Sequence, residues 1–277
     1  NGIYTKQRNG DNNIRGYLMK ILITTDWYKP TINGVVVSVA NLAVGLETMG
    51  HEVRILTLAR GRRSYKKENV IYIGSAKVER IYPNARMRIA PAHRYIKELI
   101  AWAPDIVHSQ CEFNTFPSAC RIARHCRVPL VHTYHTVYED YTHYFSPNAR
   151  VGRYLVSLFS RQIMARVDGV IAPTSKAYAI LQRYGVDCPM AVIPSGIDLE
   201  QFLRPMTAEE RTRRRTRLGI SETDRVILYL GRLAKEKNVE ELFAFLQASE
   251  NKGVRLLLVG DGPHREVLKR IAYNRGI

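Results

Sequence analysis

Short apolar runs alternate with segments of helical periodicity along most of this chain. The first run is Lys20–Thr25, and Val39, Leu42 and Leu46 after it are spaced as on one face of a helix. Such strands are typical of a parallel sheet that helices cover on both sides. Further strands are predicted over 51–58, 70–73, 105–108, 128–133, 168–172 and 190–193, with helices over 95–103, 118–126, 151–163 and 175–184. The sequence therefore predicts an α/β fold.

The pattern restarts after residue 199. Thr207–Glu210 has the spacing of a capping box, opening a basic helix that ends at Gly219. Strands over 225–231 and 254–259 follow, each leading into a helix. We divide the chain into a flexible leader (1–18), a first domain (19–199), a linker with the basic helix (200–220) and the start of a second domain (221–277). Two strands make a poor sheet alone, so the second domain is expected to be truncated.

Composition narrows the classes of partner. The four cysteines form no Cys-x-x-Cys pair and no His cluster completes a zinc pattern, which predicts reduced cytosolic thiols and no metal. The net charge of +17 predicts an anionic partner: phosphate, nucleic acid or acidic lipid. The segment from Arg60 to Lys97 contains eleven lysines and arginines but only two acidic residues, Glu68 and Glu79. The cations are at 60, 62, 63, 66, 67, 77, 80, 86, 88, 94 and 97.

Two polar loops of the first domain follow predicted strands, where open α/β sheets bind ligands. Gly34 precedes the first helix, so a phosphate can approach the backbone N–H groups at the positive end of the helix dipole. An ordinary turn is the alternative. Residues 132–144 hold three His, four Tyr and two acids. There His135 is placed to bind a sugar hydroxyl, whereas Tyr138, Tyr141 and Tyr144 have the spacing of one helix face, which packing alone also explains.

Two loops of the second domain occupy the same kind of position. Arg232 and Lys237 flank a turn that leads into a helix, which suits a diphosphate. Gly260, Asp261 and Gly262 follow the next strand, and the glycines let a nucleobase or ribose approach the backbone. Gly-Asp-Gly is also a generic turn. Neither Gly-x-Gly-x-x-Gly nor a Walker A loop occurs at Gly34, which disfavours a dinucleotide-dependent dehydrogenase.

Together these motifs resemble the retaining glycosyltransferases of family 4. The resemblance rests on Gly34, His135, Arg232 with Lys237, and Gly260–Pro263, and Pro194–Asp198 is similar to the family's hinge segment. It implies the GT-B fold, with two Rossmann-like domains facing a cleft, an acceptor-side domain over 19–199 and a nucleotide-sugar-binding domain from 221. The family's pair of glutamates would lie beyond Ile277, so the chain alone is expected to be inactive.

The resemblance also implies roles. Arg232 and Lys237 would neutralise the leaving diphosphate, and His135 would bind the donor sugar near its reacting carbon. The remaining donor-binding residues would be Gly34, Gly260, Asp261 and Gly262. Because Arg and Lys supply the positive charge, neither a metal nor another cofactor is expected.

The acceptor is predicted from two segments. His135–Tyr141 and Gln110–Phe113 look like the branch that glucosylates diacylglycerol. This implies uridine diphosphate glucose (UDP-glucose) as the donor and an acceptor site that includes Glu112, Tyr138 and Tyr141. The basic segment carries apolar residues between its cations, so Arg86, Arg88 and Trp102 are expected at the anionic inner face of the cell membrane. A solvated basic face is the alternative.

Two other functions compete with this interpretation. One is a family 4 enzyme with a soluble or polysaccharide acceptor, of the mannosyl- or sucrose-type. The other is a non-catalytic nucleic-acid-binding protein. Nucleic-acid binding would explain the net charge of +17. The sequence has no recognised nucleic-acid motif and no aromatic stacking platform, however, so no nucleic-acid partner is expected.

Overall fold

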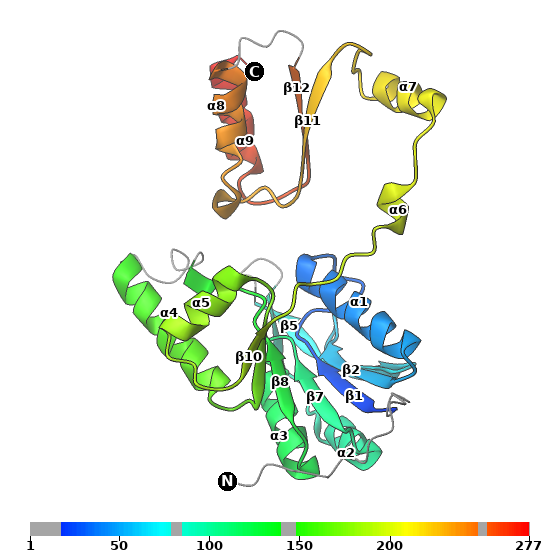
Figure 1. The fold of residues 1–277 in the computed structure, drawn as a ribbon, viewed down its shortest axis with the longest axis vertical. Coiled ribbons are helices and arrows are strands. Elements are labelled where there is room, and N and C mark those ends of the chain that lie inside the picture. Colours follow the sequence, from blue (N-terminus) through cyan, green and yellow to red (C-terminus); the bar gives the residue numbers. More distant parts are fainter. Residues whose placement is uncertain (1–17, 79–84, 140–147, 249–253, 277) are drawn as a thin grey trace, which may run out of the picture. The chain divides into compact units, whose positions relative to one another are not determined.

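The structure is a computed structural model that describes residues 18–78, 85–139, 148–248 and 254–276. It divides into two compact units, Asn1–Asp198 and Leu199–Ile277 (Figure 1). Several predicted features lie outside the described residues: the leader apart from Leu18, Glu79 and Arg80 of the basic segment, and Tyr141 and Tyr144. Along the part of the chain that is described, no helix is long and apolar enough to cross a membrane.

The first unit is built on an eight-stranded sheet of order β10-β9-β8-β7-β1-β2-β4-β3. Every pairing is parallel except that of the edge strand β3 with β4. The strands are β1 Lys20–Thr24, β2 Glu52–Leu58, β3 Tyr65–Lys67, β4 Val70–Ile73, β7 Ile106–Ser109, β8 Leu130–Thr133, β9 Gly169–Ala172 and β10 Met190–Val192. The strand order reverses at β1, which has β2 on one side and β7 on the other. Ligands of open α/β sheets bind at such a switch point.

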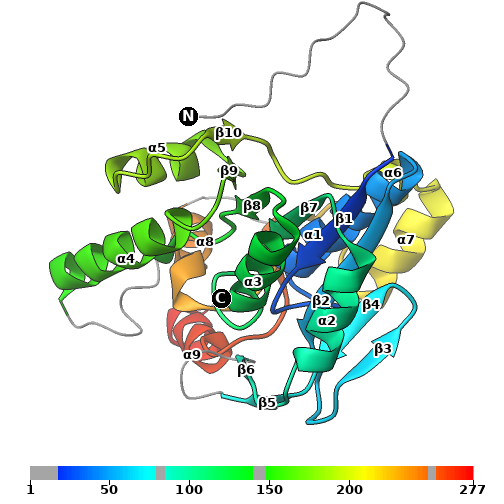
Figure 2. The ribbon, with the colours of Figure 1, turned by 90° about the horizontal axis from the view of Figure 1, so that it is seen from below.

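Helices cover both faces of this sheet, because the strand side chains alternate between two cores. In β1, Leu22 belongs to one buried cluster with Phe116 and Leu99, whereas Ile21 and Ile23 belong to another with α1. The helices are α1 Gly34–Thr48, α2 His93–Trp102, α3 Phe116–Cys126, α4 Ala149–Met164 and α5 Ser175–Arg183. Figure 2 shows α2 and α3 side by side on one face. The predicted α/β class is confirmed.

The basic segment contains strands that the sequence does not predict. Besides β3, the antiparallel pair β5 Ser75–Lys77 and β6 Arg86–Arg88 forms a separate two-stranded sheet. Gly74 precedes this pair, where the chain comes close to itself: a Cβ there would lie 2.0 Å from the Arg62 carbonyl oxygen. The segment is therefore a folded edge of the unit, with most of its lysines and arginines exposed.

The second unit has one parallel pair of strands, β11 Arg225–Leu230 and β12 Val254–Val259. Its helices are α6 Glu200–Leu203, α7 Ala208–Arg217, the 3-10 turn η2 Lys235–Lys237, α8 Glu240–Ala248 and α9 Arg265–Arg275. The capping box between Thr207 and Glu210 is present, as predicted. Asn238 takes a left-handed conformation (φ 48°) at the end of η2, and α8 begins at Glu240.

Candidate active site

Polar side chains that follow β7 and β8 are joined at the carboxyl edge of the sheet. His135 Nε2 lies 2.6 Å from Gln110 Oε1. The Glu112 carboxylate lies between two partners: it accepts a 2.6 Å hydrogen bond from the Tyr138 hydroxyl, and its other oxygen lies 3.3 Å from His132 Nε2. The structure thus brings together Glu112, His135 and Tyr138, which the sequence predicted from two separate segments.

Burial favours the uncharged forms of His135 and Tyr138. It lowers the pKa of His135 to about 4; Glu112 opposes that shift and His132 adds to it. Burial, and then the Glu112 charge, raise the pKa of Tyr138 well above its usual value. At neutral pH, His135 is therefore an uncharged ring that holds its proton on Nε2, facing Gln110, and offers Nδ1 as an acceptor.

Buried polar atoms without a partner also mark this cluster. Among the described residues, Gln110 Nε2 and His132 Nδ1 are buried and have no hydrogen-bond partner. Gln110 is 2% exposed and His132 is completely buried. Leaving such a group unpaired costs about 1–3 kcal/mol, so the polar interactions of the cluster are incomplete in this structure.

The two shifted histidines predict a dependence of stability on pH. The pKa of His135 is lowered to about 4 and that of His108 to about 3, in both cases mainly by burial. Below their ordinary value of 6.5 the unfolded chain binds more protons than the folded one, so stability falls as the pH falls from 6.5 towards 4. We expect the melting temperature of His135→Asn to fall less steeply over this range than that of the wild type. His125→Asn, at an exposed position, should follow the wild-type curve; parallel curves for all three proteins would contradict the assignment.

Asp26 is a buried carboxylate at the end of β1 that the sequence analysis did not single out. Its oxygens accept hydrogen bonds from the backbone N–H groups of Asn114 and Thr115 at 2.9 and 2.8 Å. They also accept from the side chains of the same two residues, at 2.9 and 2.8 Å. Asp26 therefore fixes the segment between Glu112 and α3 to the first strand. The available signal was its place directly after a predicted strand.

Gly34, which was predicted to precede the first helix, is the first residue of α1. The helix is capped by Asn33, whose side-chain oxygen accepts from the Val36 N–H at 2.9 Å. A Cβ on Gly34 would meet no atom within 4 Å. Space inside the protein therefore does not require glycine here, and the helix N-terminus is open to a ligand at this point.

The interfacial role predicted for Trp102 is wrong. Its side chain is 8% exposed and packs in the core, its indole N–H donates to Glu52 Oε1 at 2.7 Å, and the Arg54 guanidinium lies 4.5 Å from the ring. Glu52 opens β2, so Trp102 lies at the amino edge of the parallel sheet, away from the cluster. Helical periodicity turns Ile96, Leu99 and Trp102 inward together.

The two arginines of β6 differ. Arg86 is half-buried; its Nε donates to the Ala59 carbonyl oxygen at 3.0 Å and to Ser75 Oγ at 2.7 Å, so it holds the β5–β6 pair in place. This structural use corrects the prediction that Arg86 is a membrane contact. Arg88 is exposed, and one of its terminal nitrogens donates to Ser118 Oγ at 3.1 Å.

The second unit brings Arg232 close to Gly260–Gly262. The Leu233 N–H donates to the Asp261 carbonyl oxygen at 2.9 Å. A Cβ on Gly260 would lie 1.9 Å from the Gly231 carbonyl oxygen, and one on Gly262 would lie 2.2 Å from that of Leu233. The glycines are therefore required by the contact between the two loops, a reason other than the predicted approach of a nucleobase.

The two predicted cations of this unit have different surroundings. Arg232 is half-buried and forms an ion pair with Glu236, four residues later. Lys237 is exposed at the end of η2. Glu236 offsets part of the Arg232 charge and orients the guanidinium.

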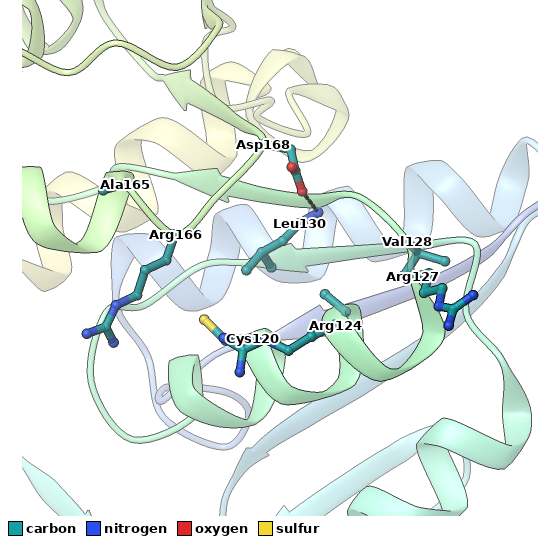
Figure 3. Close-up of a pocket in the computed structure, with 9 residues that line it drawn as sticks. Cys120, Arg124, Arg127, Val128, Leu130, Ala165, Arg166 and Asp168 are labelled. Atoms are coloured by element: carbon teal, nitrogen blue, oxygen red, sulfur yellow. Dashed lines mark hydrogen bonds between the residues drawn. The ribbon is translucent and has the colours of Figure 1, made fainter. Parts of the chain in front are cut away.

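A hollow of about 690 Å³ lies elsewhere on the first unit (Figure 3). Arg124, Arg127 and Arg166 line it, and Asp168 there accepts a 2.8 Å hydrogen bond from the Leu130 N–H. Leu130 opens β8, so the hollow is at the amino edge of the sheet and apart from the Glu112 cluster. Within the described ranges, no group of three His, Cys, Asp or Glu side chains is placed to hold a metal ion.

Comparisons with known proteins agree on one family. The model of Glycosyltransferase Family 4 matches residues 32–201, and that of Glycosyl transferases group 1 matches 210–277. An alpha-monoglucosyldiacylglycerol synthase of Streptococcus pneumoniae is 34% identical over 92% of this chain, and one of Acholeplasma laidlawii is 33% identical over 91%. The chain spans 59% and 66% of their lengths.

Among solved structures, the fold is similar to that of WaaG, a glycosyltransferase involved in lipopolysaccharide biosynthesis. The TM-score is 0.60 at 16% identity, covering 92% of this chain and 67% of WaaG. This likeness confirms the predicted GT-B class. Since the family model covers most of the chain and the motif order matches, the protein described here belongs to glycosyltransferase family 4.

Proposed function

We propose that this protein transfers glucose from UDP-glucose to diacylglycerol, with retention, at an anionic membrane surface. The observation that carries the proposal is the similarity to two alpha-monoglucosyldiacylglycerol synthases along more than nine-tenths of the chain. Buried Glu112 and half-buried Tyr138, which are hydrogen-bonded to each other, belong to the two segments that resemble that branch.

Each part of the site has a role in this proposal. In the second unit, Arg232 and Lys237 stabilise the charge on the departing diphosphate. In the first unit, the open N-terminus of α1 at Gly34 offers N–H groups to an anionic group. His135 accepts a hydrogen bond from a hydroxyl of the donor sugar through Nδ1. Gln110 Nε2 donates to an oxygen of the same sugar. Glu112 and Tyr138 border the acceptor hydroxyl. The cations meet the need for positive charge without a metal.

The test is a transfer assay with the full-length enzyme and detergent-dispersed diacylglycerol. With UDP-glucose as donor, a glucosyldiacylglycerol should appear whose anomeric proton has the coupling of an α-linkage. Guanosine diphosphate mannose and adenosine diphosphate glucose should support less than about a tenth of that rate, since a mismatched donor leaves buried polar groups unpaired. Transfer to a soluble sugar or polysaccharide, with diacylglycerol unused, would instead establish the alternative acceptor class.

The exposed cations of the basic segment support the membrane part of the proposal. This basic face consists of Arg60, Arg62, Arg63, Lys66, Lys67, Lys77, Arg88, Arg94 and Lys97, all exposed. Tyr65, Met87 and Ile89 lie among them, 46%, 53% and 47% exposed. Each cation near an anionic leaflet contributes about 1 kcal/mol to the free energy of membrane binding. Exposed apolar side chains can enter the membrane interface.

Charge reversal on this face should weaken vesicle binding. With Arg62→Glu and Arg63→Glu combined, we expect affinity for phosphatidylglycerol vesicles to fall at least about 30-fold, because two favourable charges of about 1 kcal/mol each are lost. Sedimentation with vesicles measures this, and binding should also fall as salt rises. The control Arg211→Glu with Arg214→Glu makes the same charge change on exposed positions of α7. Equal loss in both variants would show that net charge alone matters.

Retention of a short DNA duplex at physiological salt would favour the nucleic-acid alternative.

A further inference from the structure

The outer face of α4 carries an exposed apolar stripe. Val151, Tyr154, Leu155 and Leu158 are 50%, 64%, 48% and 37% exposed. Their i, i+3, i+4, i+7 spacing places them on one stripe along the helix. A different face of α4 packs against the core, and its buried residues are Gly152, Val156, Ser160, Ile163 and Met164. The stripe therefore lies on the side of α4 that packing within the first unit does not use.

Charge indicates what this stripe is suited to contact. Along Ala149–Met164 the sequence has three arginines, at 150, 153 and 161, and no acidic residue. All three are exposed, and helical spacing places Arg150 and Arg161 beside the stripe. A helix that presents exposed apolar side chains with cations beside them and no acidic residue has the composition of one that lies in the interface of an anionic bilayer.

Another exposed aromatic side chain packs against α4. Phe113 is 54% exposed and stacks on Phe159 of α4, with 5.6 Å between ring centroids. The next residue, Asn114, accepts a 2.9 Å hydrogen bond from the Arg88 N–H, between Met87 and Ile89 of the basic face. Phe113 thus packs against α4, and the residue that follows it is hydrogen-bonded to β6.

This surface borders the candidate acceptor site. The Tyr138 ring packs edge-on against Phe113 and Phe159, at centroid distances of 6.2 and 6.0 Å. The hydroxyl of the same ring donates to Glu112. The Tyr138 side chain therefore connects Phe113 and Phe159 of α4 with the buried carboxylate of Glu112.

We propose that the outer face of α4, together with Phe113, is a docking surface for an anionic bilayer. The apolar stripe enters the headgroup–acyl boundary while Arg150 and Arg161 contact anionic headgroups. Docked in this way, α4 brings the lipid surface next to Tyr138 and Glu112, so diacylglycerol, whose hydroxyl lies at that boundary, enters from the side. This last step rests on the proposed acceptor; the docking itself does not.

The test uses vesicles that contain no diacylglycerol. We expect Tyr154→Gln combined with Leu155→Gln to weaken sedimentation with phosphatidylglycerol-containing vesicles about tenfold or more, because two partly inserted apolar side chains are lost. The matched control is Val37→Gln with Val44→Gln on α1, at residues that are 47% and 59% exposed, and it should bind as the wild type does. Equal melting temperatures establish that both variants are folded.

The outcomes separate docking from catalysis. Weaker vesicle binding with unchanged transfer to detergent-dispersed diacylglycerol supports the inference. Unchanged vesicle binding overturns it and leaves the proposed glucosyl transfer standing, since transfer is measured separately. Equal affinity for purely zwitterionic vesicles overturns the role of the arginines. If the wild type elutes as a dimer that Leu155→Gln dissociates, a second copy covers the stripe and the inference is also overturned.

Discussion

Arg232→Ala is expected to lower kcat for sugar transfer about 10²–10³-fold, the loss typical of removing one preorganised group that stabilises transition-state charge. The guanidinium is held by Glu236 at the start of the turn after β11, so it is already oriented when the diphosphate departs. Arg232→Lys should recover only part of the rate, because an ammonium group cannot replace the planar fork. Steady-state kinetics of the full-length enzyme with UDP-glucose measure both effects.

The same turn supplies the control. Lys235 is exposed and has the same charge, but it is not among the predicted donor-binding residues. Lys235→Ala should leave kcat within about twofold of the wild type, whereas Lys237→Ala should approach the loss seen for Arg232→Ala. If all three variants lost the same modest factor, the net charge of the turn would matter and no individual cation would have a specific role. A fall in melting temperature specific to Arg232→Ala would assign this residue to folding.

Asp26→Ala should cause the largest loss of stability of any single change in the first unit described here. It leaves four donors from Asn114 and Thr115 without their acceptor. Since each unpaired buried group costs about 1–3 kcal/mol and relaxation recovers a part, we expect destabilisation of about 3–5 kcal/mol. For a unit of this size that corresponds to a melting temperature lower by about 10 °C.

A matched aspartate tests whether the hydrogen-bond network is the cause. Asp105 is exposed, and its carboxylate accepts a 2.7 Å hydrogen bond from the Lys20 N–H. Asp105→Ala should cost about 1 kcal/mol or less, so the two variants should differ by several degrees in thermal unfolding. Similar losses for the two aspartates would contradict the importance assigned to the Asp26 network.

Local patterns were sufficient for most helices and central strands. Apolar runs such as those of β1 and β2 specify buried parallel strands by themselves, and the Thr207–Glu210 spacing specifies a helix start. The three-residue strands β3, β5 and β6 were missed because their sequences are short and mostly polar. Such strands form because a neighbouring strand pairs with them, and that pairing does not appear in the local sequence.

The sequence pointed to individual polar residues of the candidate site but not to the hydrogen bonds that join them. His135 was selected by its position after a strand, whereas Glu112 and Tyr138 were selected because their segments resemble one branch of family 4; the structure joins all three in one hydrogen-bonded cluster with Gln110 and His132. The Asp26 network joins residues 88 and 89 positions apart, and no local spacing indicates it. Trp102 was misjudged because its neighbouring cations were given more weight than the 3.6-residue period, which places it with Leu99 on the inner face of α2.

The edge strand β3 has a consequence for solubility. It carries Lys66 and Lys67, both exposed, at the end of an eight-stranded sheet, and Lys66 forms an ion pair with Glu98. Cations on an edge strand oppose the addition of a strand from another molecule, and so protect against aggregation. These lysines would therefore be useful even in a relative that never meets a membrane. In a set of homologous sequences, positions 62 and 63 should accordingly distinguish lipid-binding members better than positions 66 and 67.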